Sequence, residues 1–588
     1  MAVNENDEIF RRSNGSSGYA SIDKPWLKYY PGEAIDLPIP KSTVYEYLYD
    51  NNKDHLDDIA LDYFGNRISY KSLFSKIKST AGGLRALNVD AGDIITVISP
   101  TLPETVYLLY AANYIGAAVN LLDPRTNESR IRDSIIATKS KCVFVIDASD
   151  YPQKIVHALS GDKSLADMII AISPATSLPV FSKVLFACKS RQNMTAGLKS
   201  WKRFVSDGIV AGDFEPVGYK PDTLAFIDYT GGTTGIPKGA LLSNDCVNGV
   251  AFQYKISKIY HIERNQTMLN VMPIFLAYGI NMLNMSLSQG VTNIIIPKFD
   301  PNKFDEYLIK YHPNHFFGVP SFYESLMESK KMDGISLEWL YTPACGGDSA
   351  NTQLEARINR FLKEHKCPAN LTKGYGMTEL SSSAASCADG INDLGSVGIP
   401  LIKNTISVFN EEDGKELPYS EIGEIAVSGP TIMLGYLNNQ EETAKAIRIH
   451  KDGKKWLHTG DLGKMTPDGM IYVINRKKRV VIRPDGHNVF PSQIENVLSK
   501  HPAVKECAVI GVPSKDTISG SWTKAIIVLK PEYKGKEKAI IEELKQLCLK
   551  ELPERDVAHF YATREKLPYT GAGKIDYQRL EKENSIEH

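Results

Sequence analysis

The sequence predicts an α/β fold with a large N-terminal domain of mainly parallel sheets flanked by helices, followed by a small α+β C-terminal domain. From about residue 40 to 475, short apolar runs alternate with stretches long enough for amphipathic helices; three of these runs are 94–98, 142–146 and 293–296. Strands that alternate with helices in this way are typical of parallel sheets covered by helices.

The last hundred residues show a different pattern. The apolar runs 508–512 and 525–529 predict strands, and 538–552 carries apolar residues near one helical face. A basic stretch, 476–479, separates the two regions. We therefore predict three parts: a flexible, Gly/Ser-rich tail over 1–25, an N-terminal domain over 26–477, and a mobile C-terminal domain over 478–588.

The composition is that of an ordinary globular protein. Of 588 residues, 43% are hydrophobic and 23% charged, which excludes a disordered or collagen-like chain. The formal net charge of −1 argues against a dedicated nucleic-acid binder, because such proteins carry a basic excess. The eight cysteines include no CxxC pair, which argues against a zinc site or a disulfide scaffold and favours a reducing, cytoplasmic compartment.

Three segments bear on export and membranes. The N-terminal segment has no apolar core, so we expect no secretory signal. Residues 105–122 are uncharged, but polar residues and a glycine interrupt them, and we predict a buried helix over about 103–114, a turn and a buried strand rather than a membrane span. For 177–191 we favour a surface helix packed on its own domain; the alternative is an amphipathic element in peripheral contact with a membrane.

The most informative segment is 228–239, which follows the apolar run 224–227. Residues 230–239 contain four glycines, three threonines and one lysine. Glycines let the backbone turn its N–H groups toward an anion, threonine hydroxyls add donors, and lysine adds a positive charge. This set of groups suits a polyphosphate. The segment is not a Walker A loop, because Pro237 separates Gly235 from the lysine and no GK[ST] occurs.

This segment resembles the phosphate loop of the AMP-forming adenylating enzymes, which include acyl-CoA synthetases, adenylation domains of peptide synthetases and firefly luciferase. Enzymes of this family use ATP to activate a carboxylic acid as an acyl-adenylate, and most acyl-CoA synthetases then pass the acyl group to a thiol. The resemblance extends from about residue 40 to 580. It implies that the phosphates of ATP are bound by Thr230, Gly231, Gly232, Thr233, Thr234, Gly235 and Lys238.

Residues 374–379 are similar to the second signature of this family. The resemblance implies that Tyr375 packs on adenine, that Thr378 touches the α-phosphate, and that Glu379 helps to hold Mg²⁺. A hard cation of this kind prefers oxygen ligands together with phosphate. The same resemblance assigns three further residues to the nucleotide site: Thr234 as a second Mg²⁺ ligand, Gly347 and Gly376.

Later motifs imply ribose contacts and a hinge. Asp461 lies in a segment similar to the ribose-binding motif, and its carboxylate can accept hydrogen bonds from both ribose hydroxyls. The resemblance implies that Arg476 contacts ribose and phosphate, and that Lys478 is the hinge about which the C-terminal domain swings. Gly486 falls where the family presents a loop to the pantetheine tunnel of CoA. The motif over 423–436 is mainly architectural in the family, and we assign it no catalytic role.

Residues 567–576 resemble the catalytic-lysine motif of the family, with Lys574 in the key position. A carboxylate that attacks the α-phosphorus brings two anions together, and negative charge leaves with pyrophosphate. A lysine on a mobile loop supplies the cation that bridges carboxylate and phosphate. Preorganised charge of this kind contributes about 10²–10³ in rate per group.

The acid pocket is expected around residues 272–279, which align with a segment that lines the acid tunnel of the family. Amino-acid-activating relatives place an Asp in this region to pair with the substrate ammonium, and none lies between Val271 and Gly290. An unpaired ammonium buried there would cost roughly several kcal/mol, which disfavours an amino-acid substrate. The predicted pocket residues are Phe275, Tyr278, Gly279 and Gly318.

We therefore predict an AMP-forming acid–thiol ligase that converts a medium- or long-chain fatty acid, ATP and CoA to acyl-CoA, with Mg²⁺. An aryl acid remains an alternative substrate, and a separate carrier protein an alternative acceptor. A third, less favoured hypothesis is a nucleotide sensor with an inactive site; against it, Lys238, Glu379, Asp461, Arg476 and Lys574 are all present.

Overall fold

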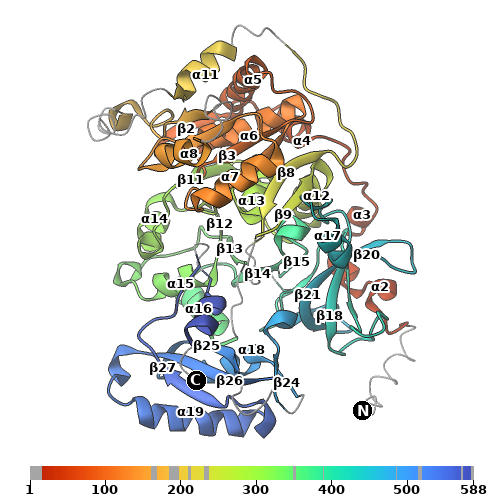
Figure 1. The fold of residues 1–588 in the computed structure, drawn as a ribbon, viewed down its shortest axis with the longest axis vertical. Coiled ribbons are helices and arrows are strands. Elements are labelled where there is room, and N and C mark those ends of the chain that lie inside the picture. Colours follow the sequence, from red (N-terminus) through yellow and green to blue (C-terminus); the bar gives the residue numbers. More distant parts are fainter. Residues whose placement is uncertain are drawn as a thin grey trace.

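The computed structural model describes residues 16–160, 169–183, 198–208, 214–230, 237–347, 352–387, 390–484, 487–513, 520–570 and 574–584. Two large sheets, a smaller antiparallel sheet and a separate C-terminal unit make up the fold (Figure 1). The predicted division into a large α/β part and a small α+β part is confirmed. The exact boundary at residue 478 stays a prediction.

The first large sheet carries the predicted phosphate loop. Its strand order is β19-β9-β8-β4-β3-β5-β6-β7. The strands from β8 to β7 run parallel, while β9 and β19 are antiparallel additions at one edge. The strands are β3 (Ile94–Ile98), β4 (Ala118–Leu122), β5 (Val143–Ile146), β6 (Ile169–Ile172), β7 (Lys199–Ser200), β8 (Leu224–Tyr229), β9 (Gly239–Ser243) and β19 (Gly435–Tyr436).

Helix α6 (Pro103–Ile115) is buried over its whole length and leads into β4 through Gly116, whose φ of +79° forms the turn. The predicted sequence of buried helix, turn and buried strand is confirmed. In the described part of the chain, no helix combines the length and apolar character that crossing a membrane requires. Helices α7 (Glu128–Thr138), α8 (Tyr151–Leu159) and α11 (Trp201–Gly208) accompany this sheet, and α5 (Tyr70–Ala86) packs against α6 and α11.

The second large sheet carries the Tyr375 signature at the end of β14. Its order is β16-β15-β14-β13-β12-β10-β11-β1-β2, and the strands from β14 to β1 run parallel. The strands are β1 (Ile59–Tyr63), β2 (Asn66–Ser69), β10 (Thr267–Asn270), β11 (Thr292–Ile295), β12 (His315–Gly318), β13 (Thr342–Cys345), β14 (Thr372–Tyr375), β15 (Ala385–Ser386) and β16 (Ile399–Pro400). Accompanying helices are α13 (Ala277–Ser288), α14 (Phe304–Tyr311), α15 (Pro320–Met327) and α16 (Thr352–Glu364). Helix α4 (Val44–Asp50) packs against α6 and α13, and α12 (Asn244–Ser257) packs against α13 and against β9 of the first sheet.

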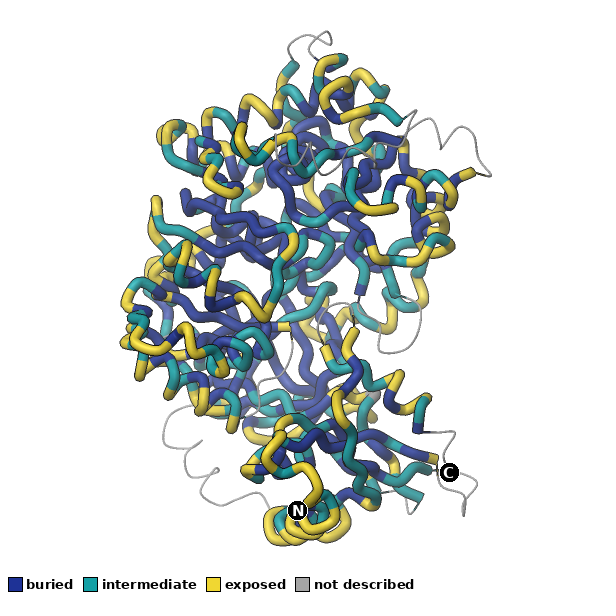
Figure 2. The backbone as a smooth tube through the Cα atoms, turned by 90° about the vertical axis from the view of Figure 1, so that its left-hand side faces the viewer, coloured by how far each residue is buried: buried dark blue, intermediate teal, exposed yellow. Residues whose placement is uncertain are grey.

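The main hydrophobic core joins the two sheets. It contains Val97 and Val119 from the first sheet, Met268 and Phe317 from the second, and apolar residues of α6, α12 and α13. Figure 2 shows this buried backbone inside a shell of exposed turns and helices. Burial of apolar surface on this scale is the main favourable contribution to folding, and it makes the strand ends that carry the motifs rigid.

A third, antiparallel sheet carries Asp461 and Arg476. Its strands are β17 (Thr405–Phe409), β18 (Gly423–Ser428), β20 (Ile447–Ile449), β21 (Lys455–Met465) and β22 (Ile471–Arg476), and α17 (Gln440–Ala446) precedes β20. Part of the predicted tail packs here, because helix α2 (Ala20–Asp23) lies against β17 and Ser21 donates hydrogen bonds to Glu416.

The C-terminal unit has its own core on each face of a small sheet. Strands β25 (Val504–Pro513), β26 (Ser521–Leu529) and β27 (Phe560–Thr563) form the sheet, and β23 (Val481–Ile482) pairs with β24 (Asn488–Val489). Helices α18 (Pro491–Leu498) and α19 (Glu537–Glu551) cover one face, and α20 (Tyr577–Asn584) covers the other. Two strands and the helix that the sequence predicts here are present.

Candidate functional site

The two ends of the predicted phosphate loop are held together by hydrogen bonds. Strand β8 ends at Tyr229 and β9 begins at Gly239, so the loop connects two antiparallel neighbours. The backbone N–H of Thr230 donates to the Lys238 carbonyl over 2.9 Å, and the N–H of Lys238 donates to Thr230 Oγ1 over 3.3 Å. Gly231, Gly232, Thr233, Thr234 and Gly235 lie outside the described residues, so their phosphate and metal contacts stay predictions.

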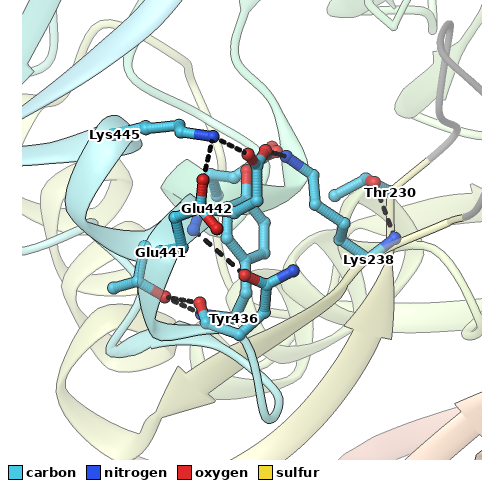
Figure 3. Close-up of polar contacts among 9 residues, drawn as sticks. Thr230, Lys238, Tyr436, Glu441, Glu442 and Lys445 are labelled. Atoms are coloured by element: carbon cyan, nitrogen blue, oxygen red, sulfur yellow. Dashed lines mark hydrogen bonds and ion pairs between the residues drawn. The ribbon is translucent and has the colours of Figure 1, made fainter.

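The Lys238 side chain is held by two residues that the sequence analysis did not assign to the site. Its Nζ lies 3.0 Å from Glu442 Oε2 and 4.1 Å from the centre of the Tyr436 ring. Tyr436 pairs with Ala240 across β19 and β9, and Glu442 lies in the first turn of α17. Figure 3 shows Lys238 and Lys445 on opposite sides of the Glu442 carboxylate.

Tyr436 links Lys238 to the predicted metal-binding acid. Its hydroxyl donates a hydrogen bond of 2.7 Å to Glu379 Oε1, and Glu379 lies in a short 3₁₀ turn, Thr378–Leu380, after β14. The backbone carbonyl of Glu379 accepts from the N–H of Met433 at 3.0 Å. The motif that contains Tyr436 was expected to be architectural; the structure places its tyrosine between the predicted phosphate cation and the predicted Mg²⁺ acid.

Asp461 brings together the residues that the resemblance assigns to adenine and ribose. Tyr375 donates its hydroxyl to Asp461 Oδ2 over 2.8 Å, and Arg476 Nε lies 2.9 Å from Asp461 Oδ1. Asp461 and Arg476 are cross-strand partners on β21 and β22. Burial raises the pKa of Asp461, and the charge of Arg476 and the Tyr375 hydroxyl oppose this shift. The Asp461 carboxylate in turn raises the pKa of Arg476.

Glu424 supports the turn that carries Asp461. Its Oε1 accepts from the N–H of Gly460 over 3.1 Å, and its Oε2 lies 3.0 Å from His458 Nδ1. The Thr459 hydroxyl donates to the Ile425 carbonyl over 2.7 Å. These contacts give the 423–425 motif a physical role in orienting the carboxylate, because they fix the three residues that precede Asp461.

Asp228 is a buried acid that the sequence analysis missed. It is fully buried at the end of β8, where its Oδ1 accepts from the N–H of Tyr229 over 2.8 Å. Its Oδ2 has no hydrogen-bond partner among the described residues. Burial raises the pKa of Asp228 well above its ordinary value, and the negative charge of Glu379 adds to the shift. Burial of this carboxyl group therefore favours its neutral form over the charged one.

The predicted acid-pocket residues form a tight junction between α13 and β12. The Tyr278 hydroxyl donates to the Gly318 carbonyl over 3.3 Å. A Cβ at Gly279 would lie 2.1 Å from the Pro273 carbonyl oxygen, so this position requires glycine. A Cβ at Gly318 would lie 2.6 Å from the Phe316 ring, which would have to shift. Phe275 is half-buried, with the Arg125 guanidinium 5.9 Å from its ring centre.

Lys574 lies in an exposed position at the base of a short hairpin in the C-terminal unit. Its carbonyl accepts from the N–H of Thr570 over 2.7 Å, and Tyr569 bridges to Ile575. Close to the expected hinge, Arg479 contacts Glu495 at 2.7 Å and lies 3.7 Å from the centre of the Tyr577 ring. These contacts tie the 477–479 turn to the unit that carries Lys574.

The remaining predicted residues differ in how far the structure describes them. A Cβ at Gly376 would lie 1.7 Å from the Ser382 carbonyl oxygen, so this turn requires glycine; Gly347 has a φ of +78° with open space around it. Lys478 lies in the 3₁₀ turn Lys477–Arg479, and Gly486 lies outside the described residues.

The segment predicted as a surface or membrane-contacting helix is described only as far as residue 183. The Ser177 hydroxyl donates to the buried Glu104 over 2.5 Å, which holds its first part on the domain. Val180 and Phe181 are exposed. Residues 184–191 lie outside the described part, so membrane contact stays a prediction.

Family comparisons match almost the whole chain. A family described as "AMP-binding enzyme" matches residues 48–437, and "AMP-binding enzyme C-terminal domain" matches residues 493–574. The long-chain-fatty-acid–CoA ligase of Bacillus subtilis is 30% identical, covering 96% of this chain and 99% of its own length. The probable 4-coumarate–CoA ligase 1 of Dictyostelium discoideum is 27% identical, covering 87% of this chain and 91% of its own length.

Solved structures give the same result for the fold. The ATP-bound MatB of Rhodopseudomonas palustris superposes with a TM-score of 0.77 at 25% identity, covering 92% of this chain and 99% of its own. An anthranilate CoA ligase in complex with anthranoyl-AMP superposes with a TM-score of 0.79 at 19% identity, covering 94% of this chain and 99% of its own.

Proposed function

Because this chain belongs to the AMP-binding enzyme family and is an AMP-forming acid–thiol ligase, we propose that it converts a medium- or long-chain fatty acid to acyl-AMP and then to acyl-CoA. The observation that carries the nucleotide part is the convergence of Tyr375, Asp461 and Arg476, with Glu379 and Lys238 linked through Tyr436. The 30% identity to a long-chain-fatty-acid–CoA ligase along nearly its full length supports the choice of acid.

In the first half-reaction, a carboxylate oxygen of the acid attacks the α-phosphorus of ATP. The bond between this phosphorus and the oxygen that bridges to the β-phosphate breaks, and pyrophosphate leaves. Asp461 accepts hydrogen bonds from the ribose hydroxyls, Lys238 and Arg476 bind phosphate oxygens, and Thr378 contacts the α-phosphate. Lys574 from the C-terminal unit neutralises the charge where carboxylate and phosphate meet.

The residues present fit a magnesium ion that arrives with the nucleotide. The described residues contain no cluster of three or more His, Cys, Asp or Glu side chains arranged to hold a metal. A single carboxylate, Glu379, held by the Tyr436 hydroxyl, suits a hard cation whose other ligands are phosphate oxygens and water. When bound, the ion would neutralise the charge of the leaving pyrophosphate.

In the second half-reaction, the CoA sulfur attacks the acyl carbon, AMP leaves, and the thiol proton goes to solvent. We expect the C-terminal unit to rotate about Lys478, so that Lys574 withdraws and the Gly486 loop faces the pantetheine. The separate cores of this unit, which hold it together without the N-terminal domain, support a rigid-body rotation.

An aryl acid is the second candidate substrate, because 4-coumarate–CoA ligases are 27% identical to this chain. A panel of fatty and aryl acids, with ATP, Mg²⁺ and CoA, separates the two when acyl-CoA products are identified by mass spectrometry. We expect the highest kcat/KM for fatty acids; a preference for hydroxycinnamic acids would contradict this.

The acceptor and the activity itself are tested separately. Acid-dependent exchange of labelled pyrophosphate into ATP measures adenylation without CoA. Exchange without acyl-CoA formation would favour a carrier protein as acceptor, and the absence of exchange over the whole panel would favour a nucleotide sensor.

A further inference from the structure

Lys238 is the last residue of the phosphate loop, and its backbone has little freedom. The two hydrogen bonds to Thr230 hold it beside the end of β8, and β9 begins at the next residue. The position of the ammonium is therefore decided by the side chain and its partners. These partners are Glu442 and the ring face of Tyr436.

Glu442 is likewise held in place by its own surroundings. Its N–H donates to Asn439 Oδ1 over 3.0 Å at the start of α17, and its Oε1 lies 2.9 Å from Lys445 Nζ. Lys445 also contacts Glu441 at 2.7 Å. The charges of Lys445 and Lys238 lower the pKa of Glu442 to about 2, so Glu442 is an anion at neutral pH.

The pair is accessible to a competing anion. The Lys238 side chain is 29% exposed and that of Glu442 is 34% exposed, so both reach solvent. A phosphate oxygen that approaches Lys238 must compete with the Glu442 carboxylate for the Lys238 ammonium group. Because Lys445 lies on the other side of this carboxylate, Glu442 keeps a cationic partner when Lys238 leaves (Figure 3).

We propose that Glu442 is a resident counter-ion of Lys238, which the polyphosphate of ATP displaces and which recaptures Lys238 when pyrophosphate leaves. This inference rests on the proposed role of Lys238 as a phosphate ligand. Glu442 is thus a positioning residue that weakens the binding of ATP and of pyrophosphate alike. Glu442 shortens the lifetime of the bound pyrophosphate, because its carboxylate is already beside Lys238 and replaces pyrophosphate as the partner of this lysine.

The test is a comparison of binding constants in three variants. We expect Glu442→Gln to tighten the binding of MgATP and of Mg-pyrophosphate about two- to fivefold. This is the size of effect expected when a partly exposed ion pair no longer has to be broken. Lys445→Gln should weaken both about twofold, since Glu442 then has only Lys238 as a cation. Isothermal titration calorimetry of the full-length protein measures both ligands, and the effect of Glu442→Gln should shrink at high salt.

Glu441→Gln is the matched control. It removes the same charge one residue away, but Glu441 contacts Lys445 and is 81% exposed, so ATP binding should not change. Weaker binding in Glu442→Gln, or equal effects of Glu442→Gln and Glu441→Gln, would overturn the proposal. The binding assay needs no turnover, so tight ATP binding together with an inactive acid panel would refute the proposed function and leave this inference standing.

Discussion

Replacing Arg476 with methionine should destabilise the protein in a pH-dependent way, because it leaves Asp461 as an unpaired buried carboxylate. The Asp461 side chain is 4% exposed and that of Arg476 is 44% exposed. Breaking a fully buried pair costs about 3–5 kcal/mol. Since water reaches one partner, we expect the free energy of unfolding to fall by about 2 kcal/mol at pH 8.

The pH dependence follows from the raised pKa of Asp461 in the folded state. Asp461 therefore stabilises the fold at pH values below its pKa in the unfolded chain, which is about 3.9. That contribution is lost as the pH rises through its pKa in the folded protein. Without Arg476 the pKa of Asp461 in the folded protein rises further, so the variant loses stability over a wider pH range than the wild type. The difference from wild type should therefore be smaller at pH 5 than at pH 8.

Urea denaturation followed by tryptophan fluorescence at pH 5 and pH 8 measures both effects. Arg448→Met is a matched control, since Arg448 is an exposed arginine on β20 of the same sheet; its effect should stay within about 0.5 kcal/mol. Arg476→Lys should recover part of the loss by restoring a positive charge. Equal destabilisation in the two methionine variants, or a loss independent of pH, would refute the reasoning.

Three further predictions concern catalysis and packing. Lys574→Ala should reduce adenylation at least about 10²-fold in pyrophosphate exchange, while thioester formation from supplied acyl-AMP survives; an equal loss of both steps would contradict the rotation of the C-terminal unit. Tyr436→Phe should raise the Mg²⁺ concentration needed for half-maximal exchange about fivefold, because Glu379 loses a hydrogen bond worth about 1 kcal/mol; an unchanged magnesium titration would show that the hydroxyl does not orient this acid. Gly279→Ala should lower stability by about 1–3 kcal/mol in the same urea assay, because its Cβ meets the Pro273 carbonyl; wild-type stability would mean that this turn adapts freely.

The motifs assign residues far apart in the sequence to one nucleotide site, and their nucleotide contacts stay predictions. Tyr375, Asp461 and Arg476 come from three separate motifs, and in the structure Tyr375 and Arg476 both contact the Asp461 carboxylate. The alternation of strands and helices predicted the fold class, because period and length distinguish a buried strand from a helix.

Other parts of the site could not be predicted in this way. Glu442 lies in an acidic first helical turn, a pattern that is typical of a solvated helix start and is explained by the helix dipole alone. Tyr436 occupies a motif whose glycines and proline suggest a turn, so only the pairing of β19 with β9 shows its ring beneath Lys238. Asp228 is the second-last residue of an apolar strand, where burial raises its pKa in a way that residue type alone does not predict.

Strand β22 ends at Arg476, and the turn expected to act as the hinge begins at the next residue. The partner of Asp461, the predicted ribose-binding carboxylate, is therefore attached directly to the predicted pivot. If a nucleotide at this pair binds more tightly in one orientation of the C-terminal unit, it stabilises that orientation by the same free energy. The predicted nucleotide pocket and the predicted hinge are thus adjacent along the chain, with no residue between Arg476 and the start of the turn.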